Sequence, residues 1–330
     1  MIDTLPLHTK KEELPVELLR FFKKVVERAG LEAGDENAPQ FATLKELAKK
    51  LQGHTLADLL SQFTELQNTI TLNTPTFSAT LSLILDSRPG ISQLVGSGVL
   101  IRISDRTFVL TAAHVTDLED ENSRLLAPGR HDYWMPLTGY FSSMRLPPSG
   151  RREDDKLDVA YFCLDPDCAR EIHPSIKALS PDQMTLEREP GHRLQYTFAG
   201  YPWRKSVVRK QTVETSSWTL TGAETGKGDY ERLGLRRAEH IAIRFNRRRV
   251  IHLRKREQAV APLPHGISGG GIYVWSETAL AKSAVCLPLA GIANRFIPGQ
   301  NLLIGTRLYV YLSCIFQEYP ELSEHMVKPS

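Results

Sequence analysis

The feature that most constrains this chain is a series of short strand-like runs that begins near Pro75. Each run is rich in β-branched and aromatic residues and is bounded by glycine, proline or polar turn residues, and roughly ten such runs follow one another. They occupy residues 77–85, 94–103, 107–110, 159–164, 195–199, 207–219, 241–245, 272–275, 285–293 and 302–306. Consecutive short strands without interleaved helices favour an all-β barrel or sandwich. Residues 308–319 are apolar at helical spacing and predict one C-terminal helix.

Residues 1–72 have helical rather than strand periodicity. The first apolar stripe consists of Leu14, Leu18, Phe21 and Val25. Capping-box patterns begin at Thr9, Thr43 and Thr55, so we expect about three helices here. A chain of 330 residues can hold two domains. We therefore expect a helical module at 1–72, which regulates the chain or binds a partner, and a separate β domain at 75–320.

Whole-chain properties exclude several classes of protein. Hydrophobic residues make up 41% of the chain, enough for a packed core, and the net charge of +3 is too small to indicate a nucleic-acid partner. No apolar run is long enough to span a membrane, and the N-terminus lacks the apolar stretch of a secretory signal. The cysteines are Cys163, Cys168, Cys286 and Cys314. Their spacing does not fit a metal site, so we expect no metal, no cofactor and free thiols in the cytoplasm.

The segment GISGG at 266–270 is the first candidate for chemistry. A serine between glycines can serve as a nucleophile on a tight turn, because glycine lets main-chain N–H groups point at a developing oxyanion. A plain glycine-rich turn before a strand is the alternative. The segment also matches the G-x-S-x-G elbow of α/β-hydrolases. In that fold the acid and the histidine follow the serine, whereas no aspartate follows Ser268 here and the only later histidine is His325.

Two candidate partners for Ser268 lie upstream. His114 follows a strand-like run and the small residues of TAA at 111–113, and Asp158 lies within an apolar run. A buried carboxylate needs a strong partner, and a histidine N–H supplies one. A capping histidine and a turn aspartate are the alternatives for either residue alone. The order His, Asp, Ser with these local contexts makes both alternatives improbable together.

These segments resemble the trypsin-like serine proteases. TAAH at 111–114, DVA at 158–160 and GISGG at 266–270 are similar to the three triad segments of that family. GSGVL at 96–100 and LAGI at 289–292 are similar to two of its strands, and GYP at 200–202 to a segment of its HtrA-like and glutamyl-endopeptidase-like bacterial members. The resemblance covers roughly 75–320. It implies a mainly β fold of two six-stranded antiparallel barrels, here with an N-terminal helical module and a C-terminal helix.

The resemblance also implies a mechanism, which is the family's general template. Ser268 would attack the scissile carbonyl, His114 would transfer the proton, and Asp158 would hold the imidazole. The main-chain N–H groups of Gly266 and Ser268 would form the oxyanion hole. The implied function is a serine endopeptidase acting on a protein or peptide.

Departures from the family concern activation and specificity. Ile267 stands where digestive trypsins have an aspartate that pairs with a new N-terminus, so that route of activation is excluded. Pro262 stands where trypsin has the carboxylate that attracts lysine or arginine. Asn294, Arg295 and Phe296 follow the cleft strand and are the expected pocket wall. Arg295 would favour an acidic substrate residue only if it points inward.

Three alternatives stay open at this level. The first is a protease-fold binding module whose oxyanion hole is unformed, and the second is an esterase with the same triad. The third is an anionic partner such as nucleic acid, because the segment 222–257 is rich in arginine. We expect this segment to be a solvated hairpin instead. The lack of an interleaved aromatic stacking platform also argues against binding of a single strand.

Overall fold

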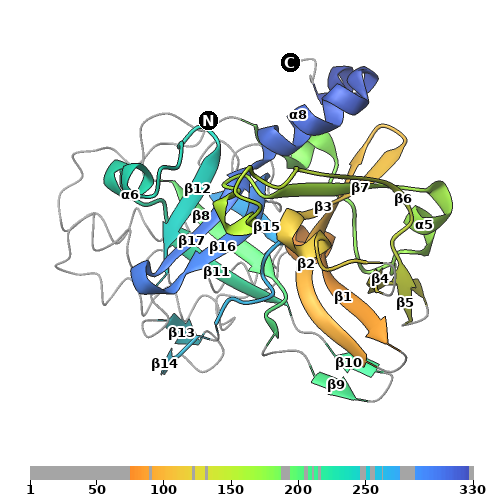
Figure 1. Ribbon diagram of the computed structural model, residues 1–330, viewed down its shortest axis with the longest axis horizontal. Coiled ribbons are helices and arrows are strands. Elements are labelled where there is room, and N and C mark those ends of the chain that lie inside the picture. Colours follow the sequence, from red (N-terminus) through yellow and green to blue (C-terminus); the bar gives the residue numbers. More distant parts are fainter. Residues whose placement is uncertain are drawn as a thin grey trace, which may run out of the picture. The chain divides into compact units, whose positions relative to one another are not determined.

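The computed structural model describes residues 75–88, 91–120, 123–130, 133–186, 194–203, 207–209, 212–214, 217–245, 250–252, 257–261, 263–275 and 287–326. The chain divides into two compact units, Met1–Pro75 with Glu277–Leu287, and Thr76–Ser276 with Pro288–Ser330. The fold below is that of the second unit (Figure 1). The helical module expected at 1–72 lies outside the described residues, as do Pro262 and Cys286.

The first sheet is antiparallel and has seven strands in the order β5-β4-β1-β2-β3-β7-β6. The strands are β1 (Thr80–Arg88), β2 (Ile91–Ile103), β3 (Arg106–Ala112), β4 (Arg124–Pro128), β5 (Trp134–Pro136), β6 (Gly139–Ser143) and β7 (Val159–Leu164). The sheet curls around a core that includes Leu81, Val109 and Phe162. It has seven strands rather than the six that the family resemblance implies. The short strands β4, β5 and β6 lack the apolar runs that sequence periodicity detects.

The second sheet is antiparallel and has six strands in the order β11-β8-β15-β16-β17-β12. The strands are β8 (Gln195–Gly200), β11 (Trp218–Ala223), β12 (His240–Arg244), β15 (Gly271–Trp275), β16 (Leu289–Ile297) and β17 (Leu302–Arg307). Its core includes Phe198, Ile272 and Leu303. Strands β2 and β3 of the first sheet contact β8 and β16 of the second, so the two cores lie next to each other.

Short helices and hairpins complete the unit. The helices are α4 (Ala113–Thr116), α5 (Pro166–Glu171), α6 (Lys227–Arg232) and α8 (Leu308–Glu318). The hairpins are β9 (Val207–Arg209) with β10 (Thr212–Glu214), and β13 (Val250–His252) with β14 (Glu257–Ala259). Short 3-10 helices cover Pro75–Ala79, Arg152–Asp154, Pro181–Gln183, Pro298–Gln300 and Pro320–Met326. No helix within the described ranges is long and apolar enough to cross a membrane.

Strand β7 is buried along its whole length, and its sequence accounts for this burial. All six of its residues are buried: Phe162 and Leu164 pack in the core of the first sheet, while α8, which is not part of that core, also contacts the strand. A strand covered on both faces needs a continuous apolar run, and VAYFCL supplies it. Two curled antiparallel sheets and a C-terminal helix confirm the expected mainly β, double-barrel fold.

Candidate active site

His114 lies at the junction of β3 and α4. The strand ends at Ala112, and the single turn of α4 then carries the imidazole out of the first sheet. The side chain of His114 is 37% exposed, so its ring can reach a substrate. The N–H of Ala113 donates to the main-chain carbonyl of Asp158 at 3.0 Å, which ties the start of α4 to the residue that precedes β7.

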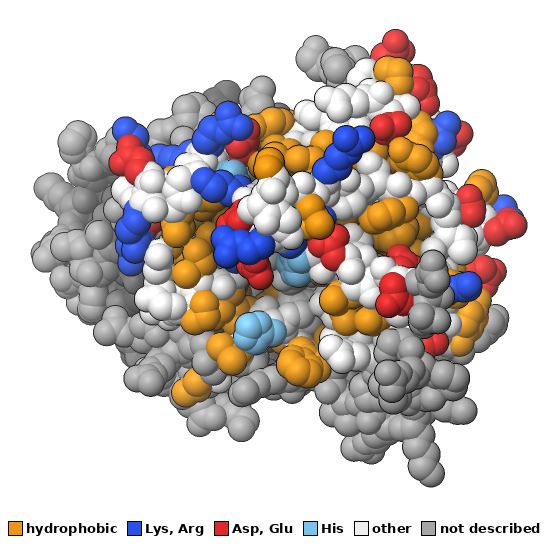
Figure 2. Space-filling model, viewed as in Figure 1, with side chains coloured by type: hydrophobic (Ala, Val, Ile, Leu, Met, Phe, Trp, Pro, Cys, Tyr) orange, Lys and Arg blue, Asp and Glu red, His pale blue; other side chains and the backbone are white. Residues whose placement is uncertain are grey.

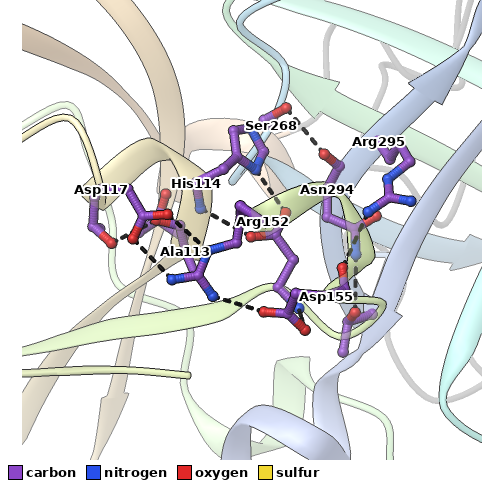
Figure 3. Close-up of polar contacts among 12 residues, drawn as sticks. Ala113, His114, Asp117, Arg152, Asp155, Ser268, Asn294 and Arg295 are labelled. Carbon is purple, nitrogen blue, oxygen red and sulfur yellow. Dashed lines mark hydrogen bonds and ion pairs between the residues drawn. The ribbon is translucent and has the colours of Figure 1, made fainter. Parts of the chain in front are cut away.

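Asp158 contacts His114 through both carboxylate oxygens (Figure 3). Oδ2 lies 2.6 Å from Nδ1 of the ring, and Oδ1 accepts the main-chain N–H of His114 at 2.9 Å. Asp158 is only 3% exposed, so this contact is shielded from water. Its φ of +53° is in the left-handed region, which aspartate adopts more readily than most residues. This conformation turns the carboxylate toward α4.

Polar groups around Asp158 hold it in that conformation. The carboxylate of Asp155 accepts the main-chain N–H of Asp158 and of Leu157, both at 3.1 Å. Arg152 donates to Asp155 at 2.8 Å and, through two nitrogens, to Asp117 at 2.7 and 2.8 Å. The hydrogen bond to Asp117 raises the pKa of Arg152 above its already high value, so the guanidinium keeps its charge.

The Arg152 network reaches both members of the His114–Asp158 pair. Asp117 is the C-cap residue of α4, the turn that carries His114. Asp155 holds the main chain of Asp158. One half-buried guanidinium therefore joins the two segments that carry the pair.

Tyr311 of α8 contacts the same region through its hydroxyl. It is fully buried, and burial raises the pKa of its phenol well above the usual value, so it remains a neutral donor. Its hydroxyl donates to the carbonyl of Thr111 at 2.9 Å and lies 3.5 Å from the carbonyl of Asp158. The C-terminal helix thus contributes a hydrogen bond to the base of the candidate site.

Ser268 lies on the turn that precedes β15 of the second sheet. Its carbonyl accepts the N–H of Ser97 in the first sheet at 2.8 Å. Its hydroxyl donates to the carbonyl of Asn294 at 3.3 Å, and within the described part of the chain it makes no hydrogen bond to His114. Figure 3 shows Ser268 beside the His114 ring. Rotation about the Cα–Cβ bond of Ser268 redirects its hydroxyl without moving the main chain.

The carbonyls of the serine turn are all anchored on one another or on neighbouring segments. His265 O accepts the N–H of Trp203 at 2.7 Å, and Gly266 O accepts the hydroxyl of Ser97 at 2.8 Å. Ile267 O accepts the N–H of Gly270 at 2.8 Å. In a trans peptide the N–H points away from the carbonyl, so these contacts also fix the N–H groups of Gly266 and Ser268.

The N–H groups of Gly266 and Ser268 donate to no acceptor within the described residues. Gly266 has a φ of +93°, and a Cβ at this position would lie 2.6 Å from Tyr201 O and 2.8 Å from Trp203 N. Both the conformation and the space therefore require glycine. Two free, fixed donors on one turn can stabilise an oxyanion.

The expected pocket residues are placed as follows. Arg295 donates to the main-chain carbonyl of Asp155 at 3.0 Å, which directs its guanidinium to the loop before Asp158. Phe296 packs against Phe245 with 5.9 Å between ring centroids. The side-chain amide of Asn294 donates to the Thr306 hydroxyl at 3.1 Å, while the main-chain carbonyl of Asn294 accepts the Ser268 hydroxyl. Pro262 is outside the described residues.

Described arginines of the segment 222–257 are paired with acids. Arg237 contacts the buried Glu224 at 2.9 Å, Arg244 contacts Asp229 at 2.7 Å, and Arg236 pairs with Glu239. Basic and acidic side chains accordingly alternate over α6 and β12 (Figure 2). The described residues contain no group of histidine, cysteine and acidic side chains arranged to hold a metal ion.

Sequence reasoning did not identify Ser97, Arg152, Asp155 or Tyr311 as parts of the site. A signal for Ser97 was present, because a serine flanked by glycines in a strand indicates that another main chain approaches closely. The run RREDDKLD at 151–158 likewise offered charges that could pair locally. Neither pattern says which groups pair, since the contacts cross between distant segments.

Comparisons with known proteins give a structural similarity but no family. The sheet topology and C-terminal helix define a trypsin-like double-barrel fold. Among solved structures, mouse neuropsin, described as a serine protease expressed in the limbic system of the brain, is similar with a TM-score of 0.45 and 15% identity over 74% of this chain and 96% of its own. No family model and no curated protein matches the chain. Function is therefore inferred from this chain's own residues.

Proposed function

We propose that this protein is a serine endopeptidase in which Ser268 is the nucleophile, His114 the general base and Asp158 its partner. The observation that carries the proposal is the two-point contact between Asp158 and His114, beside a serine whose turn presents two free N–H groups. This combination provides a nucleophile, a base, a residue that orients the base and oxyanion donors within one site.

The steps of the proposed reaction follow from the positions of these three residues. The Ser268 hydroxyl turns from Asn294 O to Nε2 of His114, gives up its proton there and attacks the substrate carbonyl carbon. The N–H groups of Gly266 and Ser268 bind the resulting oxyanion. His114 then gives the proton to the leaving amine, and the C–N bond breaks to leave an ester on Ser268. Water then gives a proton to His114 and attacks the ester, and His114 passes that proton to the Ser268 oxygen as the acid leaves.

A free main-chain edge supports a peptide as the substrate. Strand β15 pairs with β16 only as far as Ile292, whereas β17 pairs with β16 up to Ile297. Residues 294–297 therefore leave one edge unpaired within the described part of the chain. An extended peptide can add to such an edge by main-chain hydrogen bonds. A simple ester lacks the amide N–H groups that this edge would bind.

The anchored carbonyls of the serine turn favour an enzyme over a silent binding module. A silent module would need the peptide before Gly266 to be flipped. The hydrogen bond from Trp203 N–H to His265 O opposes that flip. Ile267 is 1% exposed and packs in the core of the second sheet, so a new N-terminus has no ion pair to make there.

We also propose that activity in the cytoplasm is regulated through residues 1–72 or a partner protein bound to them. This follows from the absence of an acidic residue at 267, which removes control by N-terminal cleavage. We expect the chain to be related to the HtrA-like branch of the trypsin-like proteases. A variant that begins at Thr74 tests the regulatory role. Equal turnover and equal response to a partner in this variant and the full chain would contradict it.

A peptide-library digest tests the proposed activity. Wild type should cleave a set of peptides that Ser268→Ala leaves intact, and the two proteins should unfold at similar temperatures, since the substitution removes little volume. Hydrolysis of esters without any peptide cleavage would favour an esterase instead.

A further inference from the structure

Ser97 is a buried polar residue of β2 that makes its contacts across the boundary between the two sheets. It is 0% exposed and lies between Gly96 and Gly98 in the first sheet. A Cβ on Gly96 would lie 2.7 Å from Val115 and 3.2 Å from Ser268 O. The strand therefore passes close to both the histidine turn and the serine turn.

Every polar group of Ser97 has a partner in the site region. Its hydroxyl donates to Gly266 O at 2.8 Å and accepts the N–H of Tyr201 at 2.9 Å. Its main-chain N–H donates to Ser268 O at 2.8 Å. Its carbonyl accepts the hydroxyl of Thr111, three residues before His114, at 2.8 Å. Ser97 thus contacts the turn of the proposed nucleophile and the strand β3 that leads to the proposed base.

Support from outside the serine turn matters because two of the residues in the turn are glycines in the left-handed region. Gly266 and Gly269 have φ values of +93° and +84°, and glycine visits many other conformations at little cost. Ile267 supplies no ion pair to fix the turn. Ser97 holds two of its carbonyls, Gly266 O and Ser268 O, while Trp203 and Gly270 hold the other two.

We propose that the Ser97 hydroxyl is a positioning group that keeps the oxyanion hole formed. With Gly266 O held by Ser97 and His265 O held by Trp203, both peptides that flank the Gly266 Cα are fixed. The direction of the Gly266 N–H is then fixed before substrate arrives. Because oxyanion donors act through preorganisation, loss of the hydroxyl lowers turnover more than substrate binding. This inference rests on the proposed function.

The experiment compares Ser97→Ala with Ser123→Ala. The control also removes a buried hydroxyl that donates and accepts, but the partners of Ser123 are Leu118 and Asp120, away from the serine turn. The measurements are kcat and KM for the best peptide from the library digest, and the affinity for the matching peptide aldehyde. Ser268 adds to the aldehyde to form a hemiacetal whose oxygen occupies the oxyanion hole.

The expected result is a drop in kcat of about tenfold to a hundredfold in Ser97→Ala, less than or similar to the loss of a whole donor. KM should stay within about twofold, and aldehyde affinity should fall by a factor similar to that of kcat. Ser123→Ala should change none of these by more than about twofold. If Ser97→Ala does not fold, Ser97→Cys retains a weaker donor in the same place and should show a smaller change of the same kind.

Two results separate the inference from the proposed function. Unchanged kcat and aldehyde affinity in Ser97→Ala, or a change in KM alone, would overturn the role of Ser97 while leaving the endopeptidase intact. Failure of wild type to cleave any peptide or bind any aldehyde would overturn the proposed function itself.

Discussion

Asp158 holds His114 at two points: Oδ2 lies 2.6 Å from the ring nitrogen Nδ1, and Oδ1 accepts the His114 main-chain N–H at 2.9 Å. One carboxylate therefore fixes both the ring and the main chain of the histidine. This matters because α4 is a single turn of four residues and cannot hold its own conformation. The orientation of the proposed base depends on the residue before β7.

Asp158→Asn should abolish most activity while the fold is kept. The asparagine oxygen can still accept the main-chain N–H of His114, but its NH₂ group would face Nδ1. Nε2 would then carry the ring proton and could not accept one from Ser268. By analogy with the general triad template, kcat/KM should fall by about 10⁴-fold.

The matched control for this prediction is Asp165→Asn. Asp165 is exposed at the other end of β7 and caps nothing with its side chain. Steady-state kinetics and thermal unfolding should show near wild-type behaviour for this control. Comparable kinetics for the two variants would contradict the role assigned to Asp158.

Arg152→Met should lower both stability and turnover, because it leaves the buried carboxylate of Asp155 without its cation. A loss of about 1–3 kcal/mol in the free energy of unfolding is expected. Asp155 holds the main chain of Asp158, so kcat should fall as well. Denaturant unfolding and steady-state kinetics measure the two effects.

Arg151→Met is the control for Arg152→Met, since Arg151 pairs with Asp154 at the surface and with no other acid among the described residues. Exposed pairs of this kind contribute less than about 1 kcal/mol. Equal losses in the two variants would show that the Arg152 network is not specific to the site.

His240 should make the fold less stable in acid. It is 1% exposed, and burial lowers its pKa below the usual value. Its ring nitrogens lie 3.0 and 3.1 Å from the carbonyls of Arg236 and Lys156, which favour the protonated ring, but burial has the larger effect on the pKa. The unfolded chain thus binds a proton more readily than the folded one, so stability falls as pH drops below about 6.5.

His240→Gln should therefore reduce the slope of unfolding free energy against pH between pH 5 and 7. Exposed His325 provides the control, and His325→Gln should leave that slope unchanged. Denaturant unfolding across this range measures the slopes. Identical slopes for wild type and His240→Gln would exclude a buried, neutral His240.

Cleavage should not occur mainly after lysine or arginine. The sequence has Pro262 where a carboxylate would offset the burial of a cation, and Arg295 adds positive charge nearby. Since the guanidinium of Arg295 binds the Asp155 carbonyl, small or apolar residues are expected before the cut rather than acidic ones. The peptide library measures this directly, and dominant cleavage after lysine or arginine would contradict it.

The sequence predicted those parts of the fold that local pattern determines. Strands with continuous or alternating apolar runs, such as β2, β7 and β16, were found within a few residues of their observed ends. Strands β5 and β6 were missed because they are short and half exposed, so neighbouring strands define them rather than their own residues. Residues 207–219, expected as one run, instead contain β9, β10 and the start of β11.

Only part of the candidate site could likewise be predicted from the sequence. The positions of His114, Asp158 and Ser268 could be chosen from short motifs, because glycines and small residues shape the turns around them. The left-handed φ of Asp158 and the contacts of Ser97 could not, because both depend on groups that only the folded chain brings near. The direction of Arg295 likewise depends on the carbonyl of Asp155, in the loop before β7.

Reaction with a fluorophosphonate probe tests the central claim most directly. The probe reacts with a serine hydroxyl only when a base and an oxyanion hole activate it. Peptide mass mapping should locate one adduct on Ser268 in wild type, and His114→Ala should react far more slowly although Ser268 is present. No adduct on Ser268, or equal labelling of wild type and His114→Ala, would contradict the proposed catalytic site.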